Sequence, residues 1–412
     1  MQPVDRLFMA ACCAALWVPV VVRAAAEEPV KLFAVARDTP VHGQVTLSPS
    51  LPENGSYPAG TVVTVTAEPD DGYVVDSIYY SLPGRWGPMY YEEMATSRSI
   101  TVDRAMNIGA SFIATAEVAH IEVKHNVIYA KPGAKALKYD VFSPKGADNL
   151  PCIVIIHGGG WVLNCEDVMR GLARELTRDG KFVVCSIDYR WAGKADGDEQ
   201  SNTMADIIGD VYGAIAHIRE HAADYGADPW RIGLTGDSAG GHLSAAASLM
   251  VDMIGDGGFG RTPGVFQFKP TYIPDGMSIG QLRDELLKSI KAAAPSYGVF
   301  DAGSLNHYSD DPEADASWKE AIAPQSHIPE ASERAVPQFL TRGTKDTLIS
   351  DEMVTDFKAA LEARGQRAEY LQVEGAAHAF FDWKPDAQTK AAFRQYGVPY
   401  AARMKAFFEE TL

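Results

Sequence analysis

The fold is decided by the stretch Gly236-Asp237-Ser238-Ala239-Gly240, which places a serine between two glycines. The apolar run 230–235 before it predicts a buried strand, and the small and apolar residues of 240–247 predict the first turns of a helix. A serine in a sharp strand-to-helix turn holds strained backbone angles, and larger residues in place of the glycines would collide with the strand and the helix. The pattern therefore predicts a nucleophilic serine whose hydroxyl stands above the edge of a sheet.

A second signal lies about 80 residues earlier, where the apolar strand 152–156 ends in His157-Gly158-Gly159-Gly160-Trp161. Three consecutive glycines expose backbone N–H groups that no side chain can shield. Fixed N–H dipoles of this kind stabilise the oxyanion that forms during acyl transfer. We expect the amides of Gly158, Gly159 and Ala239 to form this oxyanion hole, while His157 hydrogen-bonds the loop backbone. Trp161 is a candidate for the wall of the substrate pocket.

A serine hydroxyl needs a neighbouring base, and imidazole is suited to that role because its pKa lies near neutral pH. Of the ten histidines, His378 is the best candidate, because it follows a strand, 368–373, and a loop of small residues. The aromatic pair that begins at Phe380 comes directly after it, and Phe380 is a second candidate for the substrate pocket. His307 and His327 lack this placement at a strand end. His217 and His221 are interpreted as solvated, and the side chain of His242 is expected to point along the flank of its helix.

The imidazole in turn needs a carboxylate that fixes its tautomer. Asp346 follows the strand 338–341 and the turn 342–345, which places it at the carboxyl end of a strand, where sites gather in open α/β sheets. Asp351 is the alternative, but its position before a helical stretch favours a helix N-cap. Asp206 and Asp210, on the helix before the serine strand, are interpreted as scaffold.

The chain order Ser238, Asp346, His378 and the motifs around these residues resemble the α/β-hydrolase esterases over residues 119–412. The blocks at 157–161 and 236–242 are shared with hormone-sensitive-lipase-like carboxylesterases. The block Gly343-Thr344-Lys345-Asp346 departs from that group, and is similar to the feruloyl and acetyl-xylan esterase branch and to prolyl-oligopeptidase-like hydrolases. The resemblance implies an α/β-hydrolase fold, a mostly parallel sheet flanked by helices, and a serine esterase that uses no metal or organic cofactor. Residues 253–320, rich in aromatic side chains without a sheet period, are a candidate lid insertion or a peripheral helix pair.

Residues 27–115 have a different pattern from the rest of the chain. Alternating apolar and polar residues, as in 61–66, and frequent turn residues predict β-strands, and helix signals are nearly absent. The pieces at 43–47, 57–60, 68–73 and 99–106 resemble the divergent B-repeat modules of bacterial surface proteins, which implies a small β-rich accessory domain. Its cluster of Tyr79, Tyr80, Trp86, Tyr90 and Tyr91 favours a hairpin core or a contact with the second domain, with a platform for sugar rings as the alternative. Asp70 and Asp71 are typical of a turn rather than a calcium site.

The first 26 residues predict a secretory signal peptide, because a basic start precedes an apolar centre and a run of small residues. We therefore expect a secreted or periplasmic protein, and a lipid anchor at Cys12 is the weaker alternative. Removal of this segment leaves Cys152, Cys165 and Cys185, an odd number that predicts no disulfide framework.

The 412 residues are enough for two folded units, and the formal charge of −17 argues against nucleic acid as a partner. Taken together, the sequence predicts a secreted serine carboxylic-ester hydrolase without a membrane-spanning segment. Its expected substrate is a small-molecule or polysaccharide ester, with acetyl or feruloyl groups on plant polysaccharide suggested by the resemblance. Residues 27–115 are a candidate contact with a cell surface or carbohydrate. A prolyl-oligopeptidase-like peptidase and a non-catalytic surface or carbohydrate-binding protein are the alternatives.

Overall fold

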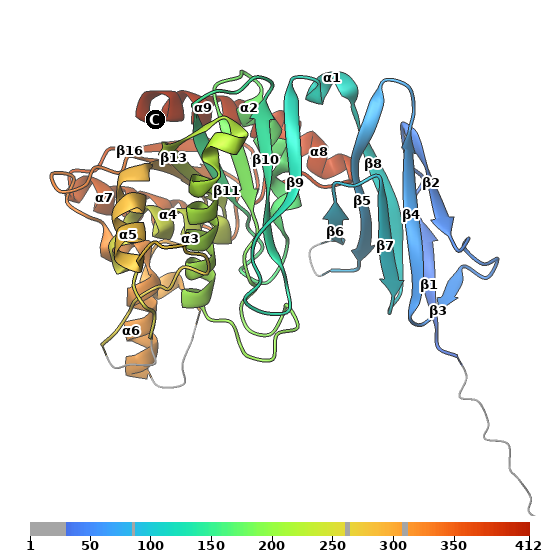
Figure 1. Cartoon of the computed structure of the whole chain (residues 1–412), viewed down its shortest axis with the longest axis horizontal. Helices are drawn as coiled ribbons and strands as arrows, with labels where there is room; N and C mark the ends of the chain where they lie inside the picture. Colours follow the sequence, from blue (N-terminus) through green and yellow to red (C-terminus); the bar gives the residue numbers. More distant parts are fainter. Residues whose placement is uncertain (1–29, 85–86, 260–263, 307–311) are drawn as a thin grey trace, which may run out of the picture.

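The computed structural model describes residues 30–84, 87–259, 264–306 and 312–412. The predicted signal peptide with Cys12 lies outside these residues, as do Trp86, His307 and Tyr308. Within the described ranges, none of the helices has the length and apolar character required to cross a bilayer. Figure 1 shows two lobes, a smaller one of β-strands and a larger one in which helices flank a sheet.

The N-terminal lobe is a β-structure of two sheets around its own core. Its five-stranded sheet has the order β3-β1-β8-β5-β6, and its three-stranded sheet the order β2-β4-β7. In β4 the alternation of Val and Thr buries Val63 and Val65 and leaves the intervening residues more exposed, as a half-buried strand requires. The strands are β1 Leu32–Arg37, β2 Gly43–Ser48, β3 Ser56–Pro58, β4 Thr61–Pro69, β5 Tyr73–Leu82, β6 Met89–Glu93, β7 Ser97–Val102 and β8 Met106–Ala114.

A short helix, α1 (Thr115–Val118), leads into the second lobe, which is built on an eight-stranded sheet of order β16-β15-β14-β13-β11-β12-β10-β9. β10 is antiparallel to both of its neighbours, and the other pairs are parallel. The buried runs of Val and Ile in β11 and β12 are typical of parallel strands covered on both faces. The strands are β9 Ile121–Ala130, β10 Leu137–Pro144, β11 Leu150–Ile156, β12 Val183–Ile187, β13 Ala227–Asp237, β14 Ile290–Ser296, β15 Gln338–Gly343 and β16 Ala368–Val373.

Helices cover both faces of this sheet, with α2 packed against α9 on one side and α3 against α4 on the other. Helix α3 begins at a capping box in which Thr203 and Asp206 satisfy each other's backbone amides. The helices are α2 Arg170–Thr177, α3 Met204–Glu220, α4 Ala239–Leu249, α5 Ile279–Ser289, α6 Pro312–Ile322, α7 Asp351–Ala363, α8 Ala387–Ala392 and α9 Val398–Thr411. A 3-10 turn, Glu166–Met169, precedes α2, and a π-helical turn, Phe393–Gly397, joins α8 to α9.

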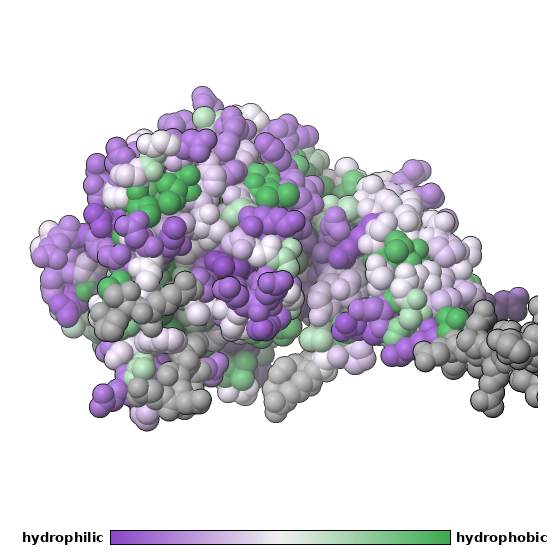
Figure 2. Space-filling view, turned by 60° about the horizontal axis from the view of Figure 1, so that its bottom comes forward, coloured by the Kyte–Doolittle hydropathy of each residue, from purple (hydrophilic) through white to green (hydrophobic). Residues whose placement is uncertain are grey.

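The segment 253–320 is not a single lid insertion, which corrects the sequence prediction. It contains β14, which pairs with β13 and β15 in the middle of the sheet, and α5, which leads into that strand. β14 reads Ile-Lys-Ala-Ala-Ala-Pro-Ser, and its small residues carry no strong strand signal. Figure 2 shows the molecule with the lower side of Figure 1 brought forward, where the larger and the smaller lobe stand side by side.

Candidate active site

Ser238 stands at the turn between β13 and α4 with a left-handed backbone, φ 52° and ψ −114°. This conformation is strained for a residue with a Cβ atom. Both glycines of the motif are required by close packing: a Cβ atom on Gly240 would lie 1.9 Å from the carbonyl oxygen of Ile156, and one on Gly236 would lie 2.4 Å from the same oxygen. The local sequence therefore fixes the serine at the carboxyl end of β13.

The structure brings Ser238, His378 and Asp346 together from three separate loops. The Oγ atom of Ser238 lies 3.0 Å from Nε2 of His378, and Nδ1 of His378 lies 2.8 Å from Oδ2 of Asp346. When Nδ1 carries the proton and donates a hydrogen bond to the carboxylate, Nε2 is free to accept the hydrogen bond of the serine hydroxyl. This is the relay in which an imidazole can act as a base toward a serine.

Asp346 is held as an anion by its surroundings. Burial raises its pKa, but hydrogen bonds from His378 and from the backbone amides of Leu348 and Ile349 outweigh that effect, and the pKa of Asp346 lies below its ordinary value. The two amides donate to Oδ1 over 2.8 and 3.0 Å, which leaves Oδ2 for the histidine. The carboxylate is thereby oriented from both sides.

The other candidates for the acid and the base, Asp351 and His217, make contacts outside this relay. Asp351 does not cap α7, since Ser350 does, and its carboxylate accepts from Tyr370 and Gln372. His217 is not simply solvated, as the sequence suggested, because it lies 2.8 Å from the hydroxyl of Tyr139 and burial lowers its pKa to about 4.

The prediction for His157 is confirmed, as is the scaffold role of Asp210. Nδ1 of His157 lies 2.7 Å from the carbonyl oxygen of Gly158, and Nε2 lies 3.3 Å from Asp188. Asp210 is buried and receives two hydrogen bonds from the side chain of Arg190. These groups support the loops around the site.

The predicted oxyanion hole requires one correction. The amide of Gly158 donates to Oδ1 of Asp237 over 2.6 Å, so it is not free to bind an oxyanion. Asp237 is buried, and a buried carboxyl group requires hydrogen-bond donors. Within the described ranges, the amides of Gly159 and Ala239 have no acceptor. They remain the candidates for the donors.

The two pocket candidates differ in their placement. Trp161 follows the glycines with φ 63°, is 8% exposed, and meets the ring of His242 edge-on at 5.5 Å. Its Nε1 atom is buried with no partner in the described part of the chain. Phe380 instead packs into the core, 3% exposed, against Phe381 and Tyr400. Its placement does not support the predicted role as a pocket wall.

Sequence reasoning missed Tyr297, which follows β14 with φ 35°. Its ring lies 4.8 Å from that of His378, and its buried hydroxyl has no partner among the residues described. The signal was hidden because β14 itself was not recognised, so a tyrosine at its carboxyl end could not be placed at the site.

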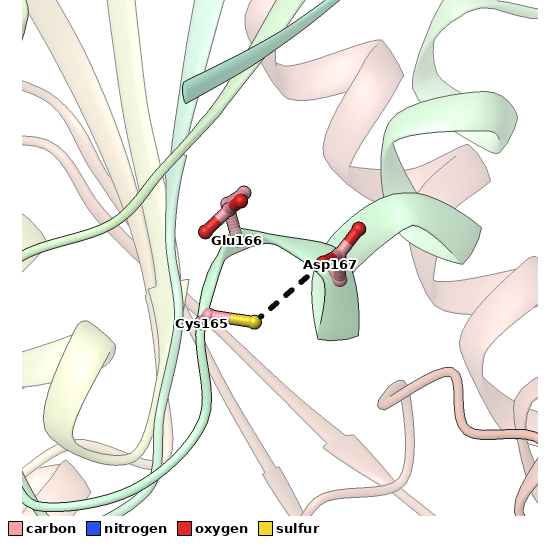
Figure 3. A group of neighbouring side chains, drawn as sticks. All are labelled: Cys165, Glu166 and Asp167. Atoms are coloured by element: carbon pink, nitrogen blue, oxygen red, sulfur yellow. Dashed lines mark hydrogen bonds between the residues drawn. The ribbon is translucent and has the colours of Figure 1, made fainter. Parts of the chain in front are cut away.

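Three potential metal ligands, Cys165, Glu166 and Asp167, have their ligand atoms within 4.8 Å of one another (Figure 3). The ammonium group of Lys138 already lies 2.8 Å from Glu166 Oε1. Burial raises the pKa values of all three groups, and protonated groups are poor ligands for cations. Because Glu166 already contacts Lys138 and burial disfavours the charged forms of all three groups, the cluster is a poor site for a metal ion.

The tyrosines of the N-terminal lobe divide into two sets. Tyr79 is buried and donates to Asp38 over 2.9 Å, with Tyr90 edge-on to its ring. Tyr80 and Tyr91 stack on each other with centroids 4.7 Å apart. The second pair lines a cleft of about 490 Å³ that Trp191 of the larger lobe also borders.

Comparison with known proteins finds similarity to esterases over the larger lobe. The BD-FAE family matches residues 139–361, more than half of the chain. The carboxylesterase NlhH of Mycobacterium tuberculosis is 36% identical over 134 residues, which cover 32% of this chain and 38% of that protein. The esterase LipQ of the same organism is 28% identical over 248 residues, 56% of this chain and 50% of that protein. The chain thus spans half or less of the length of these relatives.

Among solved structures, esterase Est2 of Thermogutta terrifontis with bound propionate is similar, with a TM-score of 0.51 and 26% identity. The similarity covers 70% of this chain and 94% of that protein. The same esterase phosphorylated by paraoxon gives a TM-score of 0.50 and 25% identity, with the same coverage. The larger lobe thus shares its α/β fold with these esterases.

Proposed function

The chain belongs to the BD-FAE family, and on that premise we propose that it is a serine carboxylic-ester hydrolase. The observation that carries the proposal is the continuous hydrogen-bond relay from Ser238 through His378 to Asp346. The names of its relatives, carboxylesterase and esterase, agree with this activity.

In the proposed mechanism, Oγ of Ser238 attacks the ester carbonyl while Nε2 of His378 takes the hydroxyl proton. The carbonyl oxygen becomes an oxyanion that the amides of Gly159 and Ala239 stabilise. His378 then returns the proton to the leaving alcohol as the carbon–oxygen bond breaks. Water, deprotonated by the same imidazole, then attacks the acyl-enzyme. The bond between the acyl carbon and Oγ of Ser238 breaks, and His378 returns the proton to Oγ as the carboxylic acid leaves. Asp346 orients His378 and stabilises the imidazolium throughout.

The proposal extends to the setting of the enzyme. We propose that the protein is secreted or periplasmic, which the signal-like first 26 residues support, and that its esters are acetyl or feruloyl groups on plant polysaccharide. The supporting argument for the substrate is the resemblance of the block 343–346 to that esterase branch. The cleft bordered by Tyr80, Tyr91 and Trp191 supports a contact with carbohydrate, because aromatic rings can stack on sugars.

The test is hydrolysis of p-nitrophenyl acetate by the full chain and by Ser238→Ala. We expect the variant to retain its circular dichroism spectrum and lose turnover by at least about a thousandfold, because the substitution removes the hydroxyl that forms the acyl-enzyme. Ser244→Ala is the matched control, since among the described residues its hydroxyl donates only to the carbonyl of Gly241 in the same helix. Turnover that survives in Ser238→Ala contradicts the proposal. A peptide amide cleaved faster than esters would favour the peptidase alternative.

A further inference from the structure

The contact between the two lobes is built around buried charge. Asp76 on β5 is fully buried, and its Oδ1 atom accepts from Arg170 over 3.0 Å and from Arg174 over 2.6 Å, both on α2. Arg170 also donates to Glu92 of β6 over 2.5 Å. Buried charges are tolerated only when they are paired and hydrogen-bonded. The two lobes therefore complete each other's polar groups.

Asp76 also reaches the loop that carries the histidine. Its Oδ2 atom accepts a hydrogen bond of 2.9 Å from Nε1 of Trp383, five residues beyond His378. Oδ2 has one further donor from its own lobe, Ser111, whose hydroxyl lies 2.7 Å away. Asp76 thus contacts the histidine loop through the indole N–H of Trp383, and its Oδ2 atom also lies 3.4 Å from Nζ of Lys390 on α8.

The path from Trp383 back to His378 is short and tightly packed. The amide of Asp382 donates to the carbonyl of Ala379 over 3.2 Å, which closes the turn directly after the histidine. The backbone amide of Trp383 donates to Val168 over 3.0 Å. A Cβ atom on Gly171 of α2 would lie 2.8 Å from the Cβ of Trp383, so the side chain rests directly on the helix backbone.

We propose that Asp76 is a positioning residue for the histidine, acting through Trp383, and that the N-terminal lobe is part of the catalytic unit. The inference rests on the proposed ester hydrolase function. Asp76 fixes the orientation of the indole, the indole fixes residues 379–383, and that turn sets the direction from which His378 approaches Ser238. If residues 27–115 were only an accessory domain, their removal would leave the hydrolysis of small esters intact. Because Asp76 holds Trp383, we expect their removal to lower this activity.

Trp383→Phe in the full chain tests this link, because phenylalanine keeps the apolar ring and removes the Nε1–H donor. We expect kcat for p-nitrophenyl acetate to fall about tenfold with KM changed less than about twofold, since small displacements of a catalytic group lower the rate steeply. Asp76→Asn should lower kcat in the same sense. In the double variant the combined loss should be smaller than the product of the two single losses, because the hydrogen bond between Asp76 and Trp383 is disturbed by both substitutions.

Ser111→Ala is the matched control, since it removes another donor to the same oxygen without touching the histidine loop. It should lower the melting temperature while kcat stays near wild type. A kcat in Trp383→Phe equal to wild type, or an equal loss of kcat in Ser111→Ala, overturns the inference. Both results leave the proposed function standing as long as Ser238→Ala is inactive. Turnover that persists in Ser238→Ala overturns the proposed function and this inference with it.

Discussion

His242, on the first turns of α4, should make the stability of this protein depend on pH. The side chain is fully buried, Nε2 donates to the carbonyl oxygen of Ile322 over 2.9 Å, and Nδ1 has no partner in the described part of the chain. Burial is the main cause that lowers the pKa of His242 to about 4, against a smaller opposing effect of the Ile322 carbonyl. The folded protein therefore holds this imidazole neutral.

The sign and size of the effect follow from this pKa. In the unfolded chain a histidine takes up its proton near pH 6.5, whereas in the folded chain it does so near pH 4. Between these values the unfolded state binds more protons, so the free energy of unfolding falls as the pH falls through this window. The pKa difference corresponds to about 3 kcal/mol, lost progressively between pH 6.5 and 4.

The substitution His242→Gln isolates this contribution, because glutamine can place its amide nitrogen near the position of Nε2 and cannot be protonated. Urea denaturation of the wild type and the variant at pH 7 and pH 4.5 gives the free energy of unfolding of each. We expect the wild type to lose about 2 kcal/mol more than the variant on acidification. All other titrating groups are common to both proteins and cancel in this difference. Equal losses in the two proteins would refute the reasoning.

Two further predictions concern the elbow and the acid. Gly240→Ala should destabilise the protein by about 3 kcal/mol or more, because the added Cβ would lie 1.9 Å from a backbone oxygen. Gly280→Ala is the control: it has open space around it in α5, so the melting temperature should stay unchanged or rise. A Gly240→Ala variant that melts with the wild type would contradict the packing. Asp346→Asn should lower kcat by about 10⁴ through loss of the correct histidine tautomer, and Asp351→Asn should leave kcat unchanged. If Asp351→Asn lowered kcat and Asp346→Asn did not, Asp351 would be the carboxylate that orients His378.

Much of the larger lobe could be predicted because its signals are local. The strands β11, β13, β15 and β16 are each expected from the sequence, since runs such as Cys152–Ile156 are apolar throughout. The three residues of the relay could be chosen because each follows a strand, and strand ends meet at one edge of a parallel sheet. Such patterns are visible within a few residues.

What the sequence could not supply depends on contacts between distant segments. Asp76 and Glu92 look like ordinary surface charges in a β-rich region, and Arg170 looks like the polar face of a helix. These side chains form a buried cluster only because the two lobes pack against each other. Asp76 and Arg170, for example, are 94 residues apart in the sequence. The sequence also predicts wrongly that the amide of Gly158 binds the oxyanion. The residues near Gly158 in the sequence do not indicate that this amide donates to the distant Asp237.

The amide of Gly158 donates to Asp237, so the charge of this carboxyl group affects the electrostatics around the serine. Asp237 adjoins Ser238, and an ionised carboxylate there would repel the oxyanion that Gly159 and Ala239 are placed to receive. Burial, reinforced by the negative charge of Asp382, raises the pKa of Asp237 well above its ordinary value, which favours the neutral form of this group. Asp346, with three hydrogen-bond donors, stays ionised. Different surroundings thus shift the two pKa values in opposite directions, which favours a negative charge on Asp346, on the side of His378 away from the reacting carbonyl.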